Sequence, residues 1–325
     1  MLQHLCIVAV ITAGAGVSVN VLHASTTDES AGRPNILVIL ADDMGSGDVQ
    51  VLNPRSKIAT PNLNQLAASG MTFTDAHSPS AVCTPTRYGL VTGRYCWRSK
   101  LKKGVLGGYS EPLLEPGRST IADMLRKAGY RTAAVGKWHL GMALPVQRDD
   151  ADKSKWDGDP GIDFSGVISD SPIHHGFDRY FGITASLDMA PYVYVRNDRF
   201  TMVPTIQQPA VKFPHFVREG PRSEDFVIDE LLDRLADEAV QFIQQSAAES
   251  SGNGERKPWF LYLPLTGPHK PTIPHERFRG VTGLKEYGDF VHQVDATVGR
   301  VLKSVDEVHA ADNTLIVFTS DNGSY

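Results

Sequence analysis

Two unbroken apolar runs constrain the fold of this chain more than any other feature. Residues 35–41 (NILVILA) and 314–319 (TLIVFT) contain no charged side chain, and polar residues follow each run at once. A strand that is apolar at nearly every position is buried on both faces, as in a largely parallel sheet covered by helices. We expect further strands over 130–135 and over the apolar run 259–263, and these strands alternate with helical patterns. We therefore expect one large α/β domain.

Capping and stop signals place the other elements between these strands. Helices are expected between Pro61 and Gly70, between Ser119 and Gly129, from Ser223 onward and over 287–305, with a short strand over 71–74. Residues 145–175 and 187–222 show no clear period and are rich in Pro, Gly and Asp. We interpret these two segments as long surface excursions near the substrate side of the sheet.

The first residues have the composition of an export signal. Residues 5–22 are apolar and uncharged, and a polar run follows His23-Ala24-Ser25. We predict a signal peptide over 1–24 and a secreted or periplasmic protein. Because residues 1–4 lack Lys and Arg and Leu22 stands near the expected cleavage site, an uncleaved membrane anchor is the alternative. Removal of the leader leaves Cys83 and Cys96, too few for a disulfide framework.

Polar side chains repeatedly follow the apolar strands. These are Asp42 and Asp43, Lys137 and His139, His269 and Lys270, and Asp321 and Asn322. In open α/β sheets, sites form outside the carboxyl ends of the strands, so we expect these groups to meet at one rim. The carboxylates and the amide are oxygen ligands that suit Ca²⁺ or Mg²⁺ rather than zinc. Solvated loop acids are the alternative.

Cys83 stands where a helix begins. Thr84 can cap it, Pro85 fits an early helical position, and an apolar stripe continues to Gly93. Free N–H groups at a helix N-terminus favour an anion there. A buried cysteine at a turn and a thiolate nucleophile are the other interpretations, although no His or Asn signature supports a papain-like arrangement. The net charge of −5 argues against a nucleic-acid binder, and no pattern indicates an oligomeric state.

With these residues in place, the chain resembles the type I, formylglycine-dependent sulfatases of the alkaline phosphatase superfamily. Residues 83–87 (CTPTR) match the family's CxPxR pattern, and Thr86 stands where many members have serine. Further matches are Thr92-Gly93-Arg94, Pro34-Asn35 through Asp42-Asp43-Met44-Gly45, residues 136–141 (GKWHLG), 175–178 (HGFD) and 320–323 (SDNG). The resemblance implies an alkaline-phosphatase-like fold: a large, mostly parallel sheet flanked by helices, within a catalytic domain over 33–325.

The resemblance also implies a function and a role for each candidate residue. A separate formylglycine-generating enzyme would oxidise Cys83 to formylglycine, the nucleophile of a sulfuric ester hydrolase acting on a sulfate ester. The implied roles are Ca²⁺ binding by Asp42, Asp43, Cys83, Asp321 and Asn322, support of the aldehyde hydrate by Arg87, sulfate binding by Lys137, orientation and deprotonation of the hydroxyl by His139, leaving-group protonation by His269, and a weaker substrate contact by Lys270. For Lys270 a solvated loop lysine is the alternative, and we interpret His175 and Asp178 as structural.

Members of the family normally continue past the metal ligands with a further sulfate-binding lysine and a small C-terminal domain. Both are missing before Tyr325, so we expect a truncated catalytic domain. Two other functions stay open: a phosphonate monoester or phosphate diester hydrolase with the same nucleophile, and a noncatalytic binder of sulfated glycans. A basic cluster follows the Cys83 helix, made of Arg94, Arg98, Lys100, Lys102 and Lys103. It either guides a polyanion toward the rim or is an ordinary solvated loop.

Overall fold

The computed structural model describes residues 32–147, 158–213, 215–249 and 257–324. The predicted signal peptide over 1–24 lies outside these residues. Residues 33–325 form one compact unit. Across the described residues, no helix combines the length and the apolar character needed to cross a bilayer.

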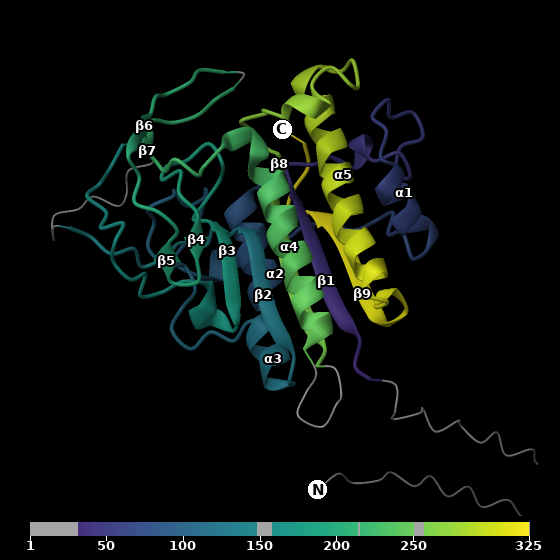
Figure 1. Cartoon of the computed structure of the whole chain (residues 1–325), viewed down its shortest axis with the longest axis horizontal. Coiled ribbons are helices and arrows are strands. Elements are labelled where there is room, and N and C mark those ends of the chain that lie inside the picture. Colours follow the sequence, from purple (N-terminus) through teal and green to yellow (C-terminus); the bar gives the residue numbers. More distant parts are fainter. Residues whose placement is uncertain (1–31, 148–157, 214, 250–256, 325) are drawn as a thin grey trace, which may run out of the picture. The chain divides into compact units, whose positions relative to one another are not determined.

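A seven-stranded sheet organises the chain, in the order β5-β4-β3-β2-β8-β1-β9 (Figure 1). Five strands run parallel, and the short β4 and β5 extend one edge in antiparallel fashion. The strands of this sheet are β1 (Asn35–Asp42), β2 (Arg131–Lys137), β3 (Arg179–Ile183), β4 (Val195–Arg196), β5 (Arg199–Phe200), β8 (Trp259–Pro268) and β9 (Thr314–Ser320). A separate hairpin pairs β6 (Ile206–Gln208) with β7 (Gly220–Arg222). The predicted mostly parallel α/β fold is confirmed.

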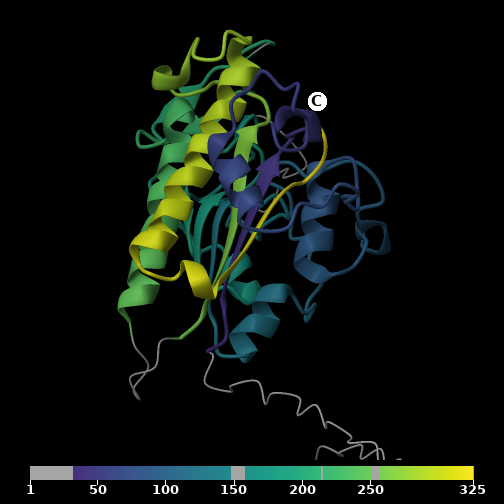
Figure 2. The same ribbon diagram turned by 90° about the vertical axis from the view of Figure 1, so that its right-hand side faces the viewer.

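Helices cover both faces of the sheet, which gives three layers (Figure 2). The long helices α4 and α5 lie on one face, and α2 and α3 lie on the other (Figures 1 and 2). The helices are α1 (Pro61–Ala68), α2 (Cys83–Thr92), α3 (Ile121–Lys127), α4 (Leu231–Ala248) and α5 (Lys285–Glu307). Because both faces are covered, β8 is buried along its whole length, as its apolar sequence predicts.

Several predicted boundaries are wrong by a few residues. Thr120, not Ser119, caps α3, because its side chain accepts the backbone N–H of Asp123 while the Asp123 carboxylate accepts the N–H of Thr120. The helix expected from Ser223 begins at Leu231, after a turn of 3-10 helix over Ile228–Glu230.

Two apolar segments differ more from expectation. No strand forms over 71–74; Met71 is 78% exposed and Phe73 is 70% exposed. The run is short, and no neighbouring strand pairs with it within the described chain, so its backbone has no ladder to join. The strand β9 occupies the edge of the sheet, where exposed and half-buried residues alternate. The excursion over 187–222 is also less superficial than predicted, since residues 187–195 are buried.

Candidate active site

The carboxyl ends of four parallel strands deliver the candidate residues to one rim. Asp42 ends β1 and Lys137 ends β2, while His269 follows β8 directly and Asp321 follows β9 directly. The N-terminus of α2 brings Cys83 to the same place, since its Sγ lies 3.4 Å from Oδ1 of Asp42. The convergence expected from the strand-end pattern is therefore present.

Three carboxylates and the Cys83 thiol form the centre of this rim. One ligand atom each from Asp42, Asp43, Asp321 and Cys83 lies within 4.8 Å of the others, and all four residues are buried. Asn322 joins them by donating its Nδ2 to Oδ1 of Asp43 at 2.5 Å. We call these five residues the acidic cluster.

Cys83 occupies the first turn of α2 for local reasons. Val82 precedes the helix in an extended conformation and Gly93 ends it in the left-handed conformation that glycine tolerates. We had expected Thr84 to cap the helix, but its side chain does not do so. Its hydroxyl instead donates to the carbonyl of His139 at 3.0 Å and accepts the N–H of Leu106 at 3.2 Å. These two bonds tie the start of α2 to the segment after β2.

Two buried cations balance the charge of the carboxylates. Lys137 donates to both oxygens of Asp42, at 2.9 and 2.7 Å. Arg87, one helical turn after Cys83, donates to Oδ2 of Asp321 at 3.1 and 2.8 Å and to the carbonyl of Lys137 at 2.9 Å. Burial alone raises the pKa of Asp42, but the charges of Lys137 and Arg87 outweigh it and hold that pKa below its usual value. The three groups are thus ionised together.

The other carboxylates are less well compensated. Burial, followed by the neighbouring charge of Asp42, raises the pKa of Asp43 to about 6. The same two causes raise the pKa of Asp321, although Arg87 opposes them. The Oδ1 atom of Asn322 is buried without a hydrogen-bond partner among the described residues. A cation that accepts oxygen ligands would relieve both the repulsion and the unpaired oxygen, so the acidic cluster fits Ca²⁺.

The Cys83 thiol is not prepared to act as a thiolate. Burial, only partly offset by Lys137, raises its pKa above the usual value. The position at a helix N-terminus does not overcome this cost, because Asp42 and Asp321 face the sulfur as well.

His139 lies at the site in a geometry that the sequence did not predict. The chain is not extended there, since the φ of His139 is 57°. From their spacing we had expected the side chains of His139 and Lys137 to point the same way, and this backbone conformation does not support that expectation. Nε2 contacts the carbonyl oxygen of Leu106 at 2.7 Å, so the proton lies on Nε2. Nδ1 is buried and has no hydrogen-bond partner among the described residues. It is thus an available proton acceptor.

His269 has the opposite tautomer. Its Nδ1 lies 2.5 Å from the carbonyl oxygen of Lys270, which places the proton on Nδ1, and Nε2 lies 3.5 Å from Oδ2 of Asp43. Burial and then the charge of Lys137 lower the pKa of His269 to about 3. The imidazole is therefore neutral near pH 7.

Ser186 is a site residue that the sequence analysis missed. Its hydroxyl lies 3.1 Å from Nζ of Lys137 and 3.2 Å from Nδ1 of His269. It follows β3, a strand that we did not predict. The strand-end rule that located the other residues would have found Ser186 if β3 had been recognised in the sequence.

The remaining candidates lie beside the site or apart from it. The ammonium of Lys270 lies 5.6 Å from the ring centroid of Phe216, a cation–π contact. His175 contacts Asp170 at 2.6 Å and stacks on Trp138. Asp178 accepts the backbone N–H of Thr132 at 2.9 Å.

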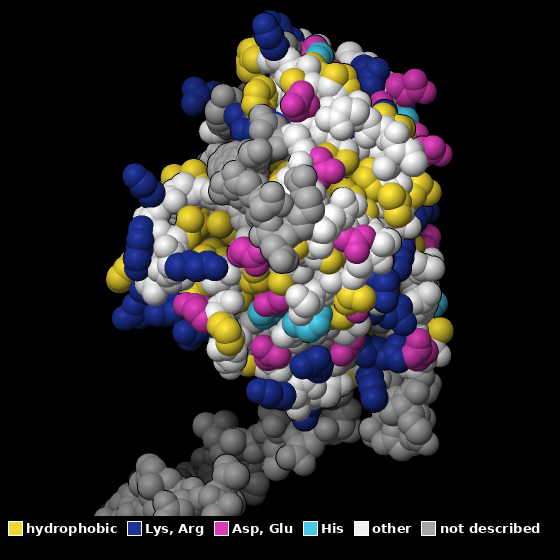
Figure 3. All heavy atoms as spheres, turned by 90° about the vertical axis from the view of Figure 1, so that its left-hand side faces the viewer, with side chains coloured by type: hydrophobic (Ala, Val, Ile, Leu, Met, Phe, Trp, Pro, Cys, Tyr) yellow, Lys and Arg dark blue, Asp and Glu magenta, His cyan; other side chains and the backbone are white. Residues whose placement is uncertain are grey.

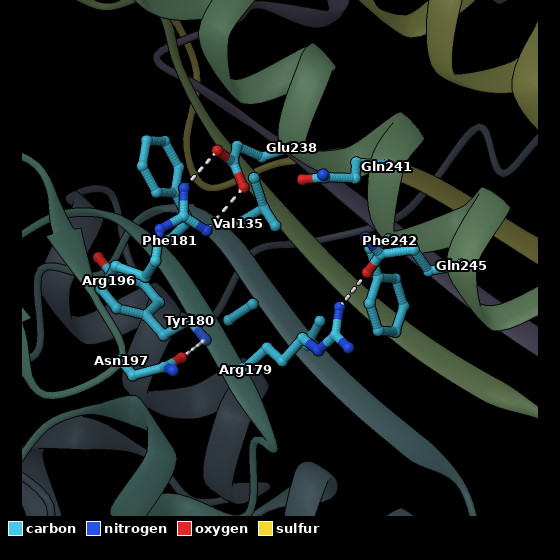
Figure 4. Close-up of a pocket in the computed structure, with 12 residues that line it drawn as sticks. Val135, Arg179, Tyr180, Phe181, Arg196, Asn197, Glu238, Gln241, Phe242 and Gln245 are labelled. Carbon is cyan, nitrogen blue, oxygen red and sulfur yellow. Dashed lines mark hydrogen bonds and ion pairs between the residues drawn. The ribbon is translucent and has the colours of Figure 1, made fainter.

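A pocket of about 350 Å³ lies between α4 and strands β2, β3 and β4, away from the acidic cluster (Figure 4). Most of its polar side chains already have partners. Arg196 binds Glu238 at 3.0 and 2.5 Å, Arg179 donates to Gln245, and Asn197 accepts the N–H of Tyr180 (Figure 4). None of the residues that line it belongs to the cluster, so it adds no group to the candidate chemistry.

Comparisons with known proteins place this geometry in a family. The sequence profile of the sulfatases matches residues 34–325. N-acetylgalactosamine-6-O-sulfatase from Bacteroides thetaiotaomicron is 33% identical over 91% of this chain and 60% of its own length. Arylsulfatase A from Bos taurus is 34% identical over 90% of this chain and 53% of its own length. The chain thus spans between half and two thirds of the length of these relatives.

The three-dimensional comparison agrees. A solved structure from a study of glycosaminoglycan metabolism by Bacteroides thetaiotaomicron superposes with a TM-score of 0.76 at 32% identity, covering 90% of this chain and 63% of that one. The profile match and the structural match together cover the sheet, its helices and the acidic cluster, and the chain belongs to the sulfatase family.

Proposed function

We propose that this chain hydrolyses sulfate esters at the acidic cluster, through a formylglycine made from Cys83 and a bound Ca²⁺. One observation carries the proposal. Cys83 begins a helix within 4.8 Å of three carboxylates, while two buried cations and a neutral histidine surround the same point. The family provides the reaction class, and the names of the relatives favour a sugar sulfate or an aryl sulfate.

The chemistry of the unmodified side chain supports a modified nucleophile. A buried thiol with a raised pKa is a poor nucleophile. A hydrated formylglycine supplies two hydroxyls on one carbon: one attacks sulfur as the S–O bond to the alcohol breaks, and deprotonation of the other re-forms the aldehyde and releases sulfate. We infer that a separate enzyme oxidises Cys83 before this chain acts.

The residues of the chain divide the remaining tasks. Asp42, Asp43, Asp321 and Asn322 would hold Ca²⁺, whose charge would polarise an oxygen of the sulfate. Arg87 fixes Asp321 and the carbonyl of Lys137. Lys137 is the candidate cation for a bound sulfate, since its ammonium lies at the rim between Asp42 and the hydroxyl of Ser186.

The two histidines are suited to different proton transfers. His139 presents an unpaired Nδ1, which can accept a proton from the hydroxyl at position 83. His269 presents Nε2 toward the cluster, while the carbonyl of Lys270 holds its other nitrogen. An anionic ester bound beside it raises its low pKa, so that Nε2 can carry the proton needed by the leaving oxygen. Lys270 lies next to this position and is the weaker candidate for a substrate contact.

The test is turnover of an aryl sulfate by the chain from a host that converts CxPxR cysteines. Peptide mass across Cys83 should show the aldehyde, and Cys83→Ala should retain the fold but lose sulfate release. Substantial activity of Cys83→Ala would exclude the proposed nucleophile. An unmodified thiol in a converting host would favour a noncatalytic binder of sulfated glycans. Faster turnover of an aryl phosphonate than of the aryl sulfate would favour the phosphonate monoester hydrolase.

We also propose that the protein is exported and that residues 1–24 are removed. The apolar, uncharged run over 5–22 supports this proposal. N-terminal sequencing of protein recovered outside the cytoplasm tests it, since retention of Met1 in a membrane fraction would indicate the uncleaved anchor.

A further inference from the structure

The segment after α2 presents its residues in two directions. Cys96 and Ser99 are buried, and Leu101 packs against the core. The side chains between and around them are exposed, namely those of Tyr95, Trp97, Arg98, Lys100, Lys102 and Lys103. We call residues 95–103 the aromatic–basic turn. It bulges from the side of α2 that faces away from α4 and α5 (Figure 2).

Inward hydrogen bonds give the aromatic–basic turn a fixed shape. The Ser99 hydroxyl donates to the carbonyl of Cys96 at 2.7 Å and accepts the N–H of Leu101 at 3.2 Å. Arg94 also holds the turn in place, since its guanidinium donates to the carboxylate of Glu115 at 2.8 Å and to the carbonyl of Arg98 at 3.1 Å. Arg94 belonged to the basic cluster that the sequence indicated. Because Glu115 already pairs with its charge, we do not count Arg94 among the cations available to a ligand.

Four cations and two aromatic rings remain on the outer side. Tyr95 is 56% exposed and Trp97 is 61% exposed, and their rings stack with centroids 6.1 Å apart. The guanidinium of Arg98 lies 5.6 Å from the Trp97 ring centroid. Among the described residues, no carboxylate pairs with Arg98, Lys100, Lys102 or Lys103. Lys102 donates to a backbone carbonyl, that of Trp97, at 2.9 Å.

This combination has a specific chemical complement. Lone exposed lysines are common, but two adjacent exposed aromatic rings have no role in the core and offer flat, rigid contact area at low entropic cost. Sugar rings pack their C–H faces on such rings, and sulfate groups attract the surrounding cations. The chain as a whole carries a net charge of −5, so the positive charge of the turn is a local feature. Figure 3 shows Lys and Arg side chains along the left edge of one face and down its right-hand side, with acidic and hydrophobic side chains between them.

We propose that the aromatic–basic turn binds a sulfated polysaccharide and holds it beside the acidic cluster. The inference deepens the proposed function, on which it rests for the sulfate ester at the cluster. The ten residues of α2 span about 15 Å, which separates the turn from Cys83. The chain then returns to the site at Leu106, whose carbonyl accepts from His139. A polymer can occupy both positions at once, whereas a small ester cannot.

The test measures binding of dextran sulfate in a Cys83→Ala background, so that no substrate is consumed. Unsulfated dextran and inorganic polyphosphate are the comparison ligands. Trp97→Ala should weaken dextran sulfate binding about fivefold and leave polyphosphate unchanged. Replacement of Lys100, Lys102 and Lys103 by Ala should weaken both about tenfold at low salt. The lysine loss should shrink as salt rises, since screening reaches roughly 10 Å at 0.1 M.

The matched control replaces three exposed lysines elsewhere, Lys57, Lys127 and Lys303, and so removes the same charge. It should change binding less than twofold. Equal losses in both triple variants, or unchanged dextran sulfate binding in Trp97→Ala, would overturn the proposal. Turnover separates it from the proposed function: with Cys83 intact, the turn variants should hydrolyse a small aryl sulfate normally. If the chain binds dextran sulfate through the turn but never turns over a sulfate ester, the binding site proposed here is supported and the proposed function is refuted.

Discussion

Removal of the Lys137 charge should be the most informative single perturbation. Lys137 and Asp42 are both fully buried, and the ammonium provides the two shortest polar contacts to that carboxylate, at 2.9 and 2.7 Å. Lys137→Met retains most of the side-chain volume and removes the charge together with the hydrogen bonds that the ammonium donates to Asp42 and Ser186. Arg87 remains 3.4 Å from Asp42 but directs its shorter bonds to Asp321. Asp42 would become a buried and poorly paired carboxylate.

The expected loss of stability is about 3–5 kcal/mol, the usual cost of removing one partner of a buried ion pair. With roughly 2 °C per kcal/mol for a domain of this size, the melting temperature should fall by about 6–10 °C. The double variant Lys137→Met with Asp42→Asn removes both charges and should recover most of this loss. Added Ca²⁺ should raise the melting temperature of Lys137→Met more than that of the wild type, because it neutralises the excess negative charge.

Thermal unfolding monitored by circular dichroism provides the measurement. Lys303→Met is the control, because the Lys303 side chain is 76% exposed and should cost almost nothing. The reasoning is refuted if Lys137→Met and Lys303→Met have the same melting temperature. It is also refuted if the double variant is no more stable than Lys137→Met alone.

Two further predictions concern the acidic cluster. Asp321→Asn should weaken Ca²⁺ binding by about tenfold or more and destabilise the chain by about 3 kcal/mol, because it removes a charged ligand and the main partner of Arg87; unchanged calorimetric Ca²⁺ affinity would contradict this. The pKa of Asp43 is raised from 3.8 to about 6, so the folded metal-free chain binds this proton more tightly than the unfolded one and should lose stability as pH rises from about 4 through 6. For the same reason Ca²⁺ affinity should fall as pH falls below about 6, and a flat affinity between pH 7 and 5 would show that Asp43 is not a ligand.

Some features of this chain follow from short-range sequence patterns. The apolar run over 35–41 identified β1 because a strand buried on both faces has no polar alternation. Cys83 was placed at a helix start, and Gly93 at its end, by local backbone preferences. Motif spacing then indicated the family that the comparisons confirm.

Other features depend on contacts between distant segments. The capping role of Thr84 was wrong because its hydroxyl bonds His139, a residue 55 positions away. Ser186 was missed because the short β3 carries too few residues to show a period, although the neighbouring β2 fixes it in the sheet. The sequence grouped Arg94 with the cations of the turn, but in the fold Arg94 forms an ion pair with Glu115.

The sequence by itself therefore determined the class of fold, the strand ends and the identity of the groups at the rim, since these depend on burial patterns and on residue type. Only the tertiary structure decided which of these groups touch. Asp42 is bonded to Lys137 and Asp321 to Arg87, while Asp43 is left with a raised pKa. Such pairings depend on distances of a few ångström between residues that lie far apart in the chain, and electrostatic energies at low dielectric change steeply over those distances.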